Sequence, residues 1–340
     1  MLKRKGNLAM TTKEQLAKLL EEQEGNYLSG SEIAREIGVT RAGIWKCIRQ
    51  LEEEGYRVEA VRNRGYRLSP DHDVISDALL RKYLLRDRDT ADLYLQAGVE
   101  VLQSVTSTND VLKERAASLP GWHTVIACSQ TRGKGRLSRS FFSPVDSGLY
   151  LSVLVRLPLQ PEVAMHLTTA AAVAACRAIK ECTEASPAIK WVNDVYVNGR
   201  KTCGILTEAS VSMESGTLDW AVMGIGFNVY EPDGGFPEEI REIAGAIAKE
   251  RKRDLRSRIA ARFLHHFYLV CQNLRNPSLV EEYRSLSMMK GRQIHVIKGE
   301  ERIPAVAENI DQECRLVVRY EDGRREVLSS GEVSIRFMET

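Results

Sequence analysis

A basic, glycine-rich stretch at residues 127–142 limits the possible folds of this chain more than any other feature. Four cationic side chains and two glycines lie within residues 132–139, between two apolar segments, 124–128 and 149–155, that have the character of β-strands. Glycine lets the backbone approach a ligand closely, and arginine and lysine donate hydrogen bonds to phosphate or carboxylate. The pattern therefore predicts a loop between two strands that either wraps an anion or is a solvated hairpin.

Length and composition indicate a soluble protein with more than one domain. The 340 residues exceed one typical domain, and 43% apolar with 28% charged residues is ordinary for globular proteins. Seven scattered cysteines, no Cys-x-x-Cys pair and no secretory signal favour reduced thiols in the cytoplasm and argue against a zinc site. No apolar run is long enough to span a bilayer, so we expect no membrane association.

Positive charge is concentrated in residues 1–70, which hold 13 lysines and arginines against 10 acidic residues, although the whole chain has a net charge of only +2. This excess permits nucleic-acid binding in that region. Capping boxes at residues 12–15 and 29–32 predict the starts of two helices, and Thr40 predicts the start of a third. The Gly-Val-Thr turn between the second and third helices has helix-turn-helix spacing.

Alternating residues at 56–68 predict a β-hairpin with a basic turn. A helix-turn-helix followed by such a hairpin resembles a winged helix, in which the third helix enters the major groove and the wing contacts phosphates or the minor groove. The predicted DNA-binding residues are the cations of the third helix and the wing, Arg41, Lys46, Arg49, Arg62 and Arg64. The alternatives are a helical domain that binds protein and a winged helix used only for assembly. Residues 69–73 are polar and resemble a linker.

Small polar side chains follow a strand predicted at 99–105. Ser107, Thr108 and Asn109 either cap a helix at 111–117 or hydrogen-bond a polar, uncharged ligand group such as a urea or an amide. Another candidate is Lys190, which lies within an apolar strand predicted at 188–197. Either its aliphatic chain extends so that the ammonium group reaches solvent, or the ammonium group places a positive charge against a carboxylate and a phosphate.

The remaining patterns are structural. The alanine-rich segment 161–180 is apolar nearly all round and predicts a buried helix, and a second helix is predicted at 255–274. Short alternating segments between residues 293 and 328, with a hairpin turn at Asp322 and Gly323, predict a small β-barrel at the end of the chain.

Four motifs carry a resemblance to a known family. They are Ser107-Thr108-Asn109, Gln130-Thr131-Arg132-Gly133-Lys134-Gly135-Arg136, Lys190-Trp191-Val192-Asn193-Asp194 and Gly224-Ile225-Gly226-Phe227-Asn228. In this order and spacing they resemble a biotin protein ligase, also called biotin–[acetyl-CoA-carboxylase] ligase. With its winged-helix start, the chain is similar to the bifunctional form that is also the biotin operon repressor. It departs from the family pattern G-R-G-R-x-G-R at Lys134 and Ser138, and from K-W-P-N-D at Val192.

The resemblance implies an α+β fold in three domains: a winged helix-turn-helix DNA-binding domain at 1–70, a central mixed-sheet α/β ligase domain at 74–285 and an SH3-like C-terminal β-barrel at 286–340. It implies an ATP-dependent ligase that forms biotinyl-5′-AMP and transfers biotin to a lysine of the biotin carboxyl carrier protein. It also implies a repressor of biotin genes, with biotinyl-5′-AMP as corepressor and a homodimer on operator DNA when the adenylate is bound.

The resemblance also implies roles for individual residues. Lys190 and Arg136 would be catalytic. The implied biotin contacts are Ser107, Thr108, Asn109, Gln130, Lys134, Gly135, Arg136 and Lys190. The implied contacts to ATP or the adenylate are Gly133, Lys134, Gly135, Arg136, Lys190 and Asn193. Mg²⁺ is implied alongside ATP and biotin, with no residue assigned to it.

Two other interpretations remain open. A lipoate or octanoate transferase has a similar central fold, although such enzymes lack an N-terminal winged helix and the cation-rich glycine loop argues against them. A ligand-responsive transcription factor without catalysis would need only the DNA-binding start. Biotin-dependent exchange between ATP and pyrophosphate would separate these interpretations from the ligase.

Overall fold

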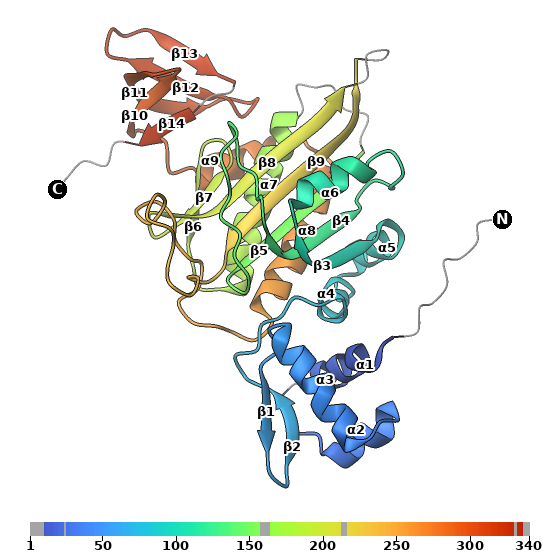
Figure 1. Cartoon of the computed structure of the whole chain (residues 1–340). Helices are drawn as coiled ribbons and strands as arrows, with labels where there is room; N and C mark the ends of the chain where they lie inside the picture. Colours follow the sequence, from blue (N-terminus) through green and yellow to red (C-terminus); the bar gives the residue numbers. More distant parts are fainter. Residues whose placement is uncertain (1–9, 24, 157–163, 212–215, 330–331, 336–340) are drawn as a thin grey trace. The chain divides into compact units, whose positions relative to one another are not determined.

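The structure is a computed structural model that describes residues 10–23, 25–156, 164–211, 216–329 and 332–335. Residues 1–81 with 250–257 form one unit, and residues 82–249 with 258–340 form a second (Figure 1). Residues 1–9, 24, 157–163, 212–215, 330–331 and 336–340 lie outside the described residues, so each of the three predicted domains is described only in part.

Three helices and a two-stranded hairpin begin the first unit. They are α1 (Thr12–Glu22), α2 (Gly30–Ile37), α3 (Arg41–Glu53), β1 (Val58–Val61) and β2 (Gly65–Leu68). Ser29 and Glu32 form the predicted capping box of α2, and Thr40 caps α3 as predicted. The helix-turn-helix and the hairpin that follows it are confirmed.

The first capping box lies one residue before its predicted position. Thr11, not Thr12, accepts a hydrogen bond from Glu14 N at 3.3 Å, and the Glu14 carboxylate accepts one from Thr11 N at 2.8 Å. Two consecutive threonines cap a helix equally well in principle, so the threonines alone do not fix where the helix begins. The glutamate three residues after Thr11 makes the choice.

The predicted linker at 69–73 is packed against a segment from much later in the chain. Arg256 N donates a hydrogen bond to Asp73 Oδ1 at 3.0 Å, and the Arg256 guanidinium donates to the Asp73 backbone carbonyl. Both side chains are almost fully buried. Removing either partner would leave an uncompensated buried charge, so this ion pair ties residues 250–257 to the first unit.

His72 is buried beside this ion pair and stacks on Tyr56, with ring centroids 5.2 Å apart. Neither of its ring nitrogens has a hydrogen-bond partner among the described residues. Burial, together with the nearby guanidinium groups of Arg253 and Arg256, lowers the pKa of His72 to about 4. The folded unit therefore favours the neutral imidazole.

We expect the first unit to lose stability as the pH falls below about 6.5, because the unfolded chain then binds a proton that folded His72 excludes. Between about pH 7.5 and pH 5 this contribution falls by about 2 kcal/mol. Urea unfolding of the wild type and of His72→Phe, which keeps a ring against Tyr56, measures the effect. Equal pH dependence in the two proteins would show that His72 is not responsible.

The second unit is built on a mixed seven-stranded sheet of order β3-β4-β5-β9-β8-β7-β6. β3 and β4 are parallel, and every other neighbouring pair is antiparallel. The strands are β3 (Val99–Val105), β4 (Thr124–Gln130), β5 (Gly148–Val155), β6 (Pro187–Lys190), β7 (Asp194–Val197), β8 (Arg200–Val211) and β9 (Leu218–Asn228). The glycine-rich stretch joins β4 to β5, so the predicted loop between two strands is confirmed.

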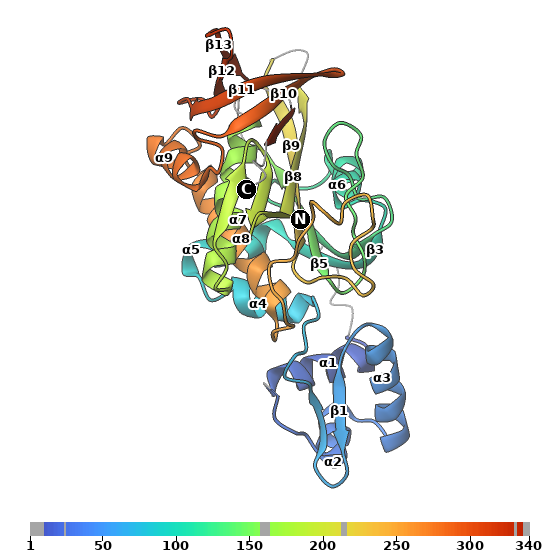
Figure 2. The same cartoon turned by 90° about the vertical axis from the view of Figure 1, so that its left-hand side faces the viewer.

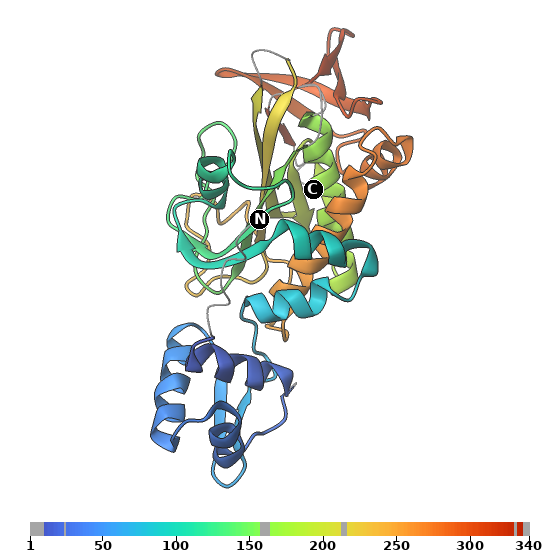
Figure 3. The same ribbon diagram turned by 90° about the vertical axis from the view of Figure 1, so that its right-hand side faces the viewer.

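Helices cover both faces of this sheet (Figures 2 and 3). α7 (Ala164–Cys182) and α8 (Leu255–Cys271) lie on one face, where Phe227 of β9 packs against Phe263 of α8. α6 (Thr108–Arg115) lies on the other, where Leu112 packs with Val222 of β9. The other helices are α4 (Asp77–Leu84), α5 (Arg88–Ala97) and α9 (Pro277–Leu286). No helix in the described ranges is both long and apolar enough to cross a membrane.

The C-terminal residues form a five-stranded antiparallel sheet of order β13-β12-β11-β10-β14. Its strands are β10 (Gln293–Lys298), β11 (Glu301–Ile310), β12 (Leu316–Tyr320), β13 (Arg325–Leu328) and β14 (Glu332–Ile335). The predicted module of short alternating strands is therefore confirmed.

The prediction of a single strand at 188–197 is wrong. The chain reverses after Lys190, and β6 pairs antiparallel with β7 so that Lys190 lies opposite Asp194. Apolar residues continue through the turn because other elements bury them: Trp191 Nε1 donates to Cys314 O at 2.9 Å, and Tyr283 OH donates to Val192 O at 3.0 Å. A buried apolar turn gives the same sequence pattern as a strand.

Candidate active site

A cavity of about 390 Å³ lies over β8 and β9, on the face of the sheet that carries α6. All four motifs contribute to its walls. The predicted residues that line it are Ser107, Thr108, Asn109, Gln130, Lys134, Gly135, Arg136, Lys190 and Asn193. Gly133 is not among the described lining residues, and its carbonyl instead accepts a hydrogen bond from Phe141 N at 2.8 Å.

The first motif forms a polar end of the cavity. Ser107 occupies the N-cap position of α6, yet within the described residues its side chain makes no capping hydrogen bond. Thr108 N and Thr108 Oγ1 lie 2.9 Å and 3.2 Å from Gln130 Oε1. Helix capping therefore does not account for the Ser107 hydroxyl, and this observation favours the interpretation that these residues bind a ligand.

Ser152 of β5 and Glu208 of β8 fix the orientation of this polar group. Ser152 Oγ lies 2.7 Å from Thr108 Oγ1 and 2.6 Å from Asn109 Oδ1. Asn109 Nδ2 donates to Glu208 Oε2 at 2.8 Å. Binding sites for small molecules combine apolar walls with a few fixed polar groups of this kind.

Two glycines of β9 allow other residues to approach the sheet closely. An added Cβ would lie 2.0 Å from Asn109 Oδ1 at Gly224 and 2.4 Å from the Phe141 ring at Gly226. Any side chain at either position would displace Asn109 or Phe141. The Gly-x-Gly pattern of the fourth motif is thus explained by close packing under the cavity.

The glycine-rich loop folds into a tight hairpin. Gly135 N donates to Arg139 O at 2.7 Å, and Arg139 N donates to Arg136 O at 3.1 Å. Leu137 and Ser138 at the tip both have left-handed backbones, with φ of 54° and 59°. Such a turn favours glycine, so Ser138 holds backbone strain where the family pattern has glycine.

We expect Ser138→Gly to stabilise this hairpin, because glycine adopts the left-handed conformation without a Cβ penalty. The amide of Gly135, which the hairpin protects, should exchange its hydrogen about twofold to fivefold more slowly. Native-state hydrogen exchange followed by mass spectrometry measures this. Ser140→Gly, which adds flexibility outside the turn, is the matched control, and faster exchange in Ser138→Gly would contradict the assigned strain.

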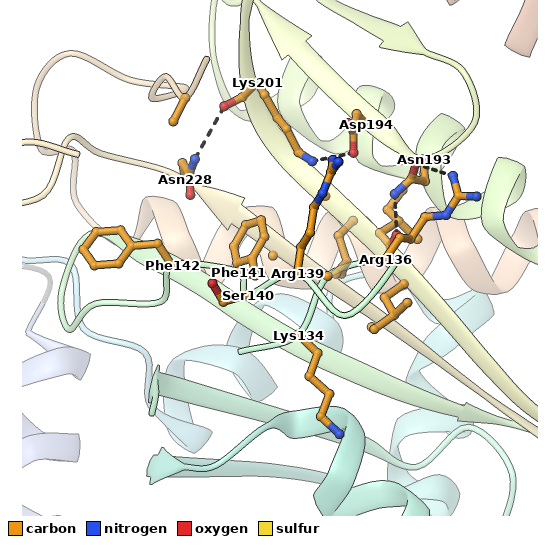
Figure 4. A pocket seen from close by; sticks show the side chains of 18 of the residues that line it. Lys134, Arg136, Arg139, Ser140, Phe141, Phe142, Asn193, Asp194, Lys201 and Asn228 are labelled. Carbon is orange, nitrogen blue, oxygen red and sulfur yellow. Dashed lines mark hydrogen bonds and ion pairs between the residues drawn. The ribbon is translucent and has the colours of Figure 1, made fainter. Parts of the chain in front are cut away.

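The two central cations of the loop point in different directions (Figure 4). Arg136 Nη1 donates to Asn193 Oδ1 at 3.2 Å, beside the turn that carries Lys190. Lys134 Nζ pairs instead with Asp110 Oδ1 of α6 at 2.6 Å. Burial alone would raise the pKa of Asp110, but hydrogen bonds from Lys134 and Lys113 outweigh it and hold this pKa below its usual value. Lys134 thus anchors the loop to α6.

The lining of the cavity is strongly cationic. Lys190 is half-buried, with Nζ 6.0 Å from the centroid of the Tyr196 ring. Lys201 Nζ pairs with Asp194 Oδ1 at 2.7 Å. Among the described lining residues the cations are Lys134, Arg136, Arg139, Lys190 and Lys201, and the acidic residue is Asp194. This balance of charge attracts anionic ligands.

Several lining residues were not assigned to the site from the sequence. Asp194 is the last residue of the third motif, and Phe141 and Phe142 end the glycine-rich stretch. Their places in or next to a motif could have identified them as lining residues. Ile240, Ile243 and Ala244 come from a segment without helix or strand and carry no such signal.

The predicted DNA-binding side chains are all exposed on the first unit. They are Arg41, Lys46 and Arg49 on α3, and Arg62 and Arg64 at the hairpin. The opposite face of α3 is buried in the unit's core. The Arg64 guanidinium packs over the Tyr27 ring, 4.2 Å from its centroid, which holds it against the base of the hairpin.

Comparison with known protein families gives three matches in chain order. Residues 12–67 match an HTH domain, residues 101–228 match the biotin/lipoate A/B protein ligase family, and residues 291–336 match the biotin protein ligase C terminal domain. The three matches fall on the helix-turn-helix unit, on the sheet that carries the cavity and on the C-terminal sheet.

Individual relatives extend these matches. The bifunctional ligase/repressor BirA of Bacillus subtilis (strain 168) is 34% identical over 239 residues, which cover 70% of this chain and 71% of that protein. BirA of Escherichia coli (strain K12) is 27% identical over 319 residues, covering 93% of this chain and 95% of that protein. The solved biotin protein ligase from Aquifex aeolicus in complex with biotin and ATP has a TM-score of 0.58 and 26% identity, covering 70% of this chain and 98% of that chain.

The fold and the cation-rich cavity define a ligase of the biotin/lipoate class that carries an N-terminal helix-turn-helix. The similarity to the bifunctional ligase/repressors then fixes the family within that class. The chain belongs to the biotin protein ligase family. The α+β fold with a winged helix-turn-helix, a mixed-sheet ligase domain and an SH3-like C-terminal domain is confirmed.

Proposed function

We propose that this chain activates biotin with ATP to give biotinyl-5′-AMP and then transfers the biotin to a lysine of a biotin carboxyl carrier protein. The observation that carries the proposal is the convergence of four separated motifs on one cationic cavity of about 390 Å³. The similar ligase from Aquifex aeolicus has been solved with biotin and ATP. Biotin and ATP are therefore the substrates that we assign to this cavity.

We assign the ureido group of biotin to the polar end of the cavity. Ser107, Thr108, Asn109 and Gln130 offer hydroxyl and amide groups there, and Ser152 and Glu208 hold two of them in place. A urea is uncharged and has both donors and acceptors, which matches this set of groups. The carboxylate of biotin would then lie by the cations of the lining.

The first chemical step needs charge neutralisation more than a base. A biotin carboxylate oxygen bonds to the α-phosphorus of ATP, the bond from that phosphorus to the bridging oxygen breaks, and pyrophosphate leaves. The carboxylate is already ionised at pH 7, so no proton has to be removed. Lys190 and Arg136 are placed to offset the negative charge around the α-phosphate, and Asn193 orients Arg136 at 3.2 Å.

The glycine-rich loop covers the reacting groups in this proposal. Lys134, Gly135 and Arg136 would lie over the carboxylate and phosphate, with Lys134 tying the loop to Asp110. Closing the loop excludes water from the mixed anhydride. The carrier lysine then attacks the acyl carbon, AMP leaves, and the lysine retains the biotin as an amide.

Mg²⁺ fits this site as a companion of ATP. Across the described ranges, no group of three or more His, Cys, Asp or Glu side chains could hold a metal ion on its own. Magnesium in nucleotide sites is commonly bound by one or two carboxylates together with phosphates, and Asp194 is a carboxylate in the cavity wall. When bound, the ion would supply further positive charge at the phosphates.

Exchange of labelled pyrophosphate into ATP tests the ligase proposal. We expect exchange that requires biotin and is not supported by lipoate or octanoate. Exchange supported by lipoate would place the chain with the lipoate enzymes of the same family. Absence of exchange with every acid would leave only a ligand-binding role.

The exposed basic face of α3 supports a second role as a repressor of biotin genes. The first unit would bind operator DNA through Arg41, Lys46 and Arg49 on α3 and Arg62 and Arg64 on the wing. Biotinyl-5′-AMP would act as corepressor by promoting a homodimer. In this proposal residues 1–70 are the DNA-binding domain, residues 74–285 the catalytic domain and residues 286–340 the SH3-like C-terminal domain. A gel shift with DNA upstream of biotin genes, with and without biotin plus ATP, tests this role. Equal binding of the DNA with and without the adenylate would refute the proposed coupling between adenylate and operator binding.

A further inference from the structure

Trp45 presents its indole ring to solvent in the middle of α3. Its side chain is 59% exposed, whereas Ile44, Ile48 and Leu51 on the other side of the helix are buried in the core of the first unit. Single exposed apolar side chains are common on protein surfaces, so the exposure of Trp45 matters only together with its position on α3. The ring is therefore placed where a partner can reach it.

The position of Trp45 on the helix matters. Arg41, Trp45 and Arg49 follow one another at intervals of four residues, so they form one stripe along α3. α3 is the second helix of the helix-turn-helix, the element that such domains place in the major groove of DNA. Trp45 thus lies at the centre of the stripe that would face the groove.

Trp45 and Arg49 form a pair before any partner binds. The Arg49 guanidinium carbon lies 5.2 Å from the Trp45 ring centroid, and Arg49 Nη1 lies 3.5 Å from Glu52 Oε2. A guanidinium held over an indole has fewer side-chain conformations to lose on binding. The pair therefore presents an apolar face and a forked donor side by side.

The charge along α3 selects the kind of partner. The exposed cations Arg41, Lys46 and Arg49 lie in the first nine residues of the helix, whereas Glu52 and Glu53 are at its end. This arrangement complements a polyanion approaching the first two-thirds of the helix. The indole has one N–H donor, but most of its surface is apolar. In the major groove the apolar feature of the base edges is the 5-methyl group of thymine.

We propose that Trp45 is a specificity-determining residue that packs against the 5-methyl group of a thymine in the operator half-site, while Arg49 is held by the indole for a neighbouring base or phosphate. This inference rests on the proposed repressor function. The DNA-binding residues predicted from the sequence are all cations. Trp45 adds an apolar contact that can distinguish thymine from the other bases.

Replacing thymine by deoxyuridine removes only the methyl group and so tests this contact directly. The full chain, supplied with biotin, ATP and Mg²⁺, is first used to select binding sites from a pool of random duplexes. Each thymine of the selected half-site is then changed singly to deoxyuridine. We expect one or two of these changes to weaken wild-type binding about fourfold each, the effect of one buried methyl group.

Variants of Trp45 complete the test. Trp45→Ala should bind the thymine and deoxyuridine duplexes equally, with affinity about tenfold below that of the wild type for the selected site. Trp45→Phe should keep part of the discrimination, and Lys18→Ala, an exposed cation on α1, should keep all of it. Circular dichroism of each variant checks that the helix is retained.

The outcomes separate the two proposals. If the wild type selects no duplex with the adenylate bound, the repressor function fails. If it selects a site but Trp45→Ala discriminates thymine from deoxyuridine as the wild type does, the inference about Trp45 fails alone. Uniform weakening of every duplex by Trp45→Ala, with no loss of discrimination, would also overturn it and would indicate a contact to the DNA backbone.

Discussion

Replacing Lys190 with alanine is expected to slow the formation of biotinyl-5′-AMP by about a hundredfold to a thousandfold, the usual effect of removing one preorganised electrostatic group. Lys190 ends β6 at a turn that hydrogen bonds from Trp191 and Tyr283 hold in place. Neighbouring Lys201 is paired with Asp194 at 2.7 Å and is not placed to substitute for it. Pyrophosphate release in a single turnover measures the step.

Lys180→Ala is the matched control for this prediction, because Lys180 is exposed at the end of α7 and does not line the cavity. It should behave as the wild type. Biotin affinity measured by calorimetry separates binding from chemistry. Near-normal pyrophosphate release by Lys190→Ala would sink the proposed catalytic role.

Replacing Arg136 with glycine is expected to let the intermediate escape. Arg136 links the glycine-rich loop to Asn193 across the cavity, and it lies in the wall that would contact the phosphate. Losing a charge-assisted hydrogen bond of this kind should speed dissociation of biotinyl-5′-AMP by about tenfold to a hundredfold. Release of labelled adenylate from preloaded protein, followed by rapid filtration, measures the rate.

The control for Arg136→Gly is Arg132→Gly, which removes an exposed cation of the same loop from outside the described cavity wall. It should retain the adenylate as the wild type does. If Arg136→Gly also holds biotinyl-5′-AMP as tightly as the wild type, the loop does not act as a clamp through this residue. Faster release by both variants would point to general loosening of the loop.

Much of the fold was predictable because local signals and tertiary structure agree at many places. The strand predicted at 99–105 coincides with β3, and the capping box of Ser29 and Glu32 begins α2. The Asn198-Gly199 turn joins β7 to β8 with the positive φ angles that its residue types favour. The lining of the cavity was predictable for a different reason: its residues lie in four short motifs that follow one another along the chain.

The remaining features depend on contacts between residues far apart in sequence. Asp73 is packed in the first unit because Arg256, from much later in the chain, pairs with it. The turn after Lys190 is apolar because Tyr283 and Cys314 accommodate it. Ile240 and Ile243 line the cavity from a segment without regular structure. Local patterns do not encode such contacts, which explains where the predictions failed.

The most direct test of the central claim, that this cavity makes and holds an acyl-adenylate, is mass spectrometry of the small molecule that stays bound after the protein is incubated with biotin, ATP and Mg²⁺. We expect one biotinyl-5′-AMP per chain, also when lipoate is present in excess. Recovery of unreacted biotin alone, or of an adenylate of lipoate, would contradict this claim.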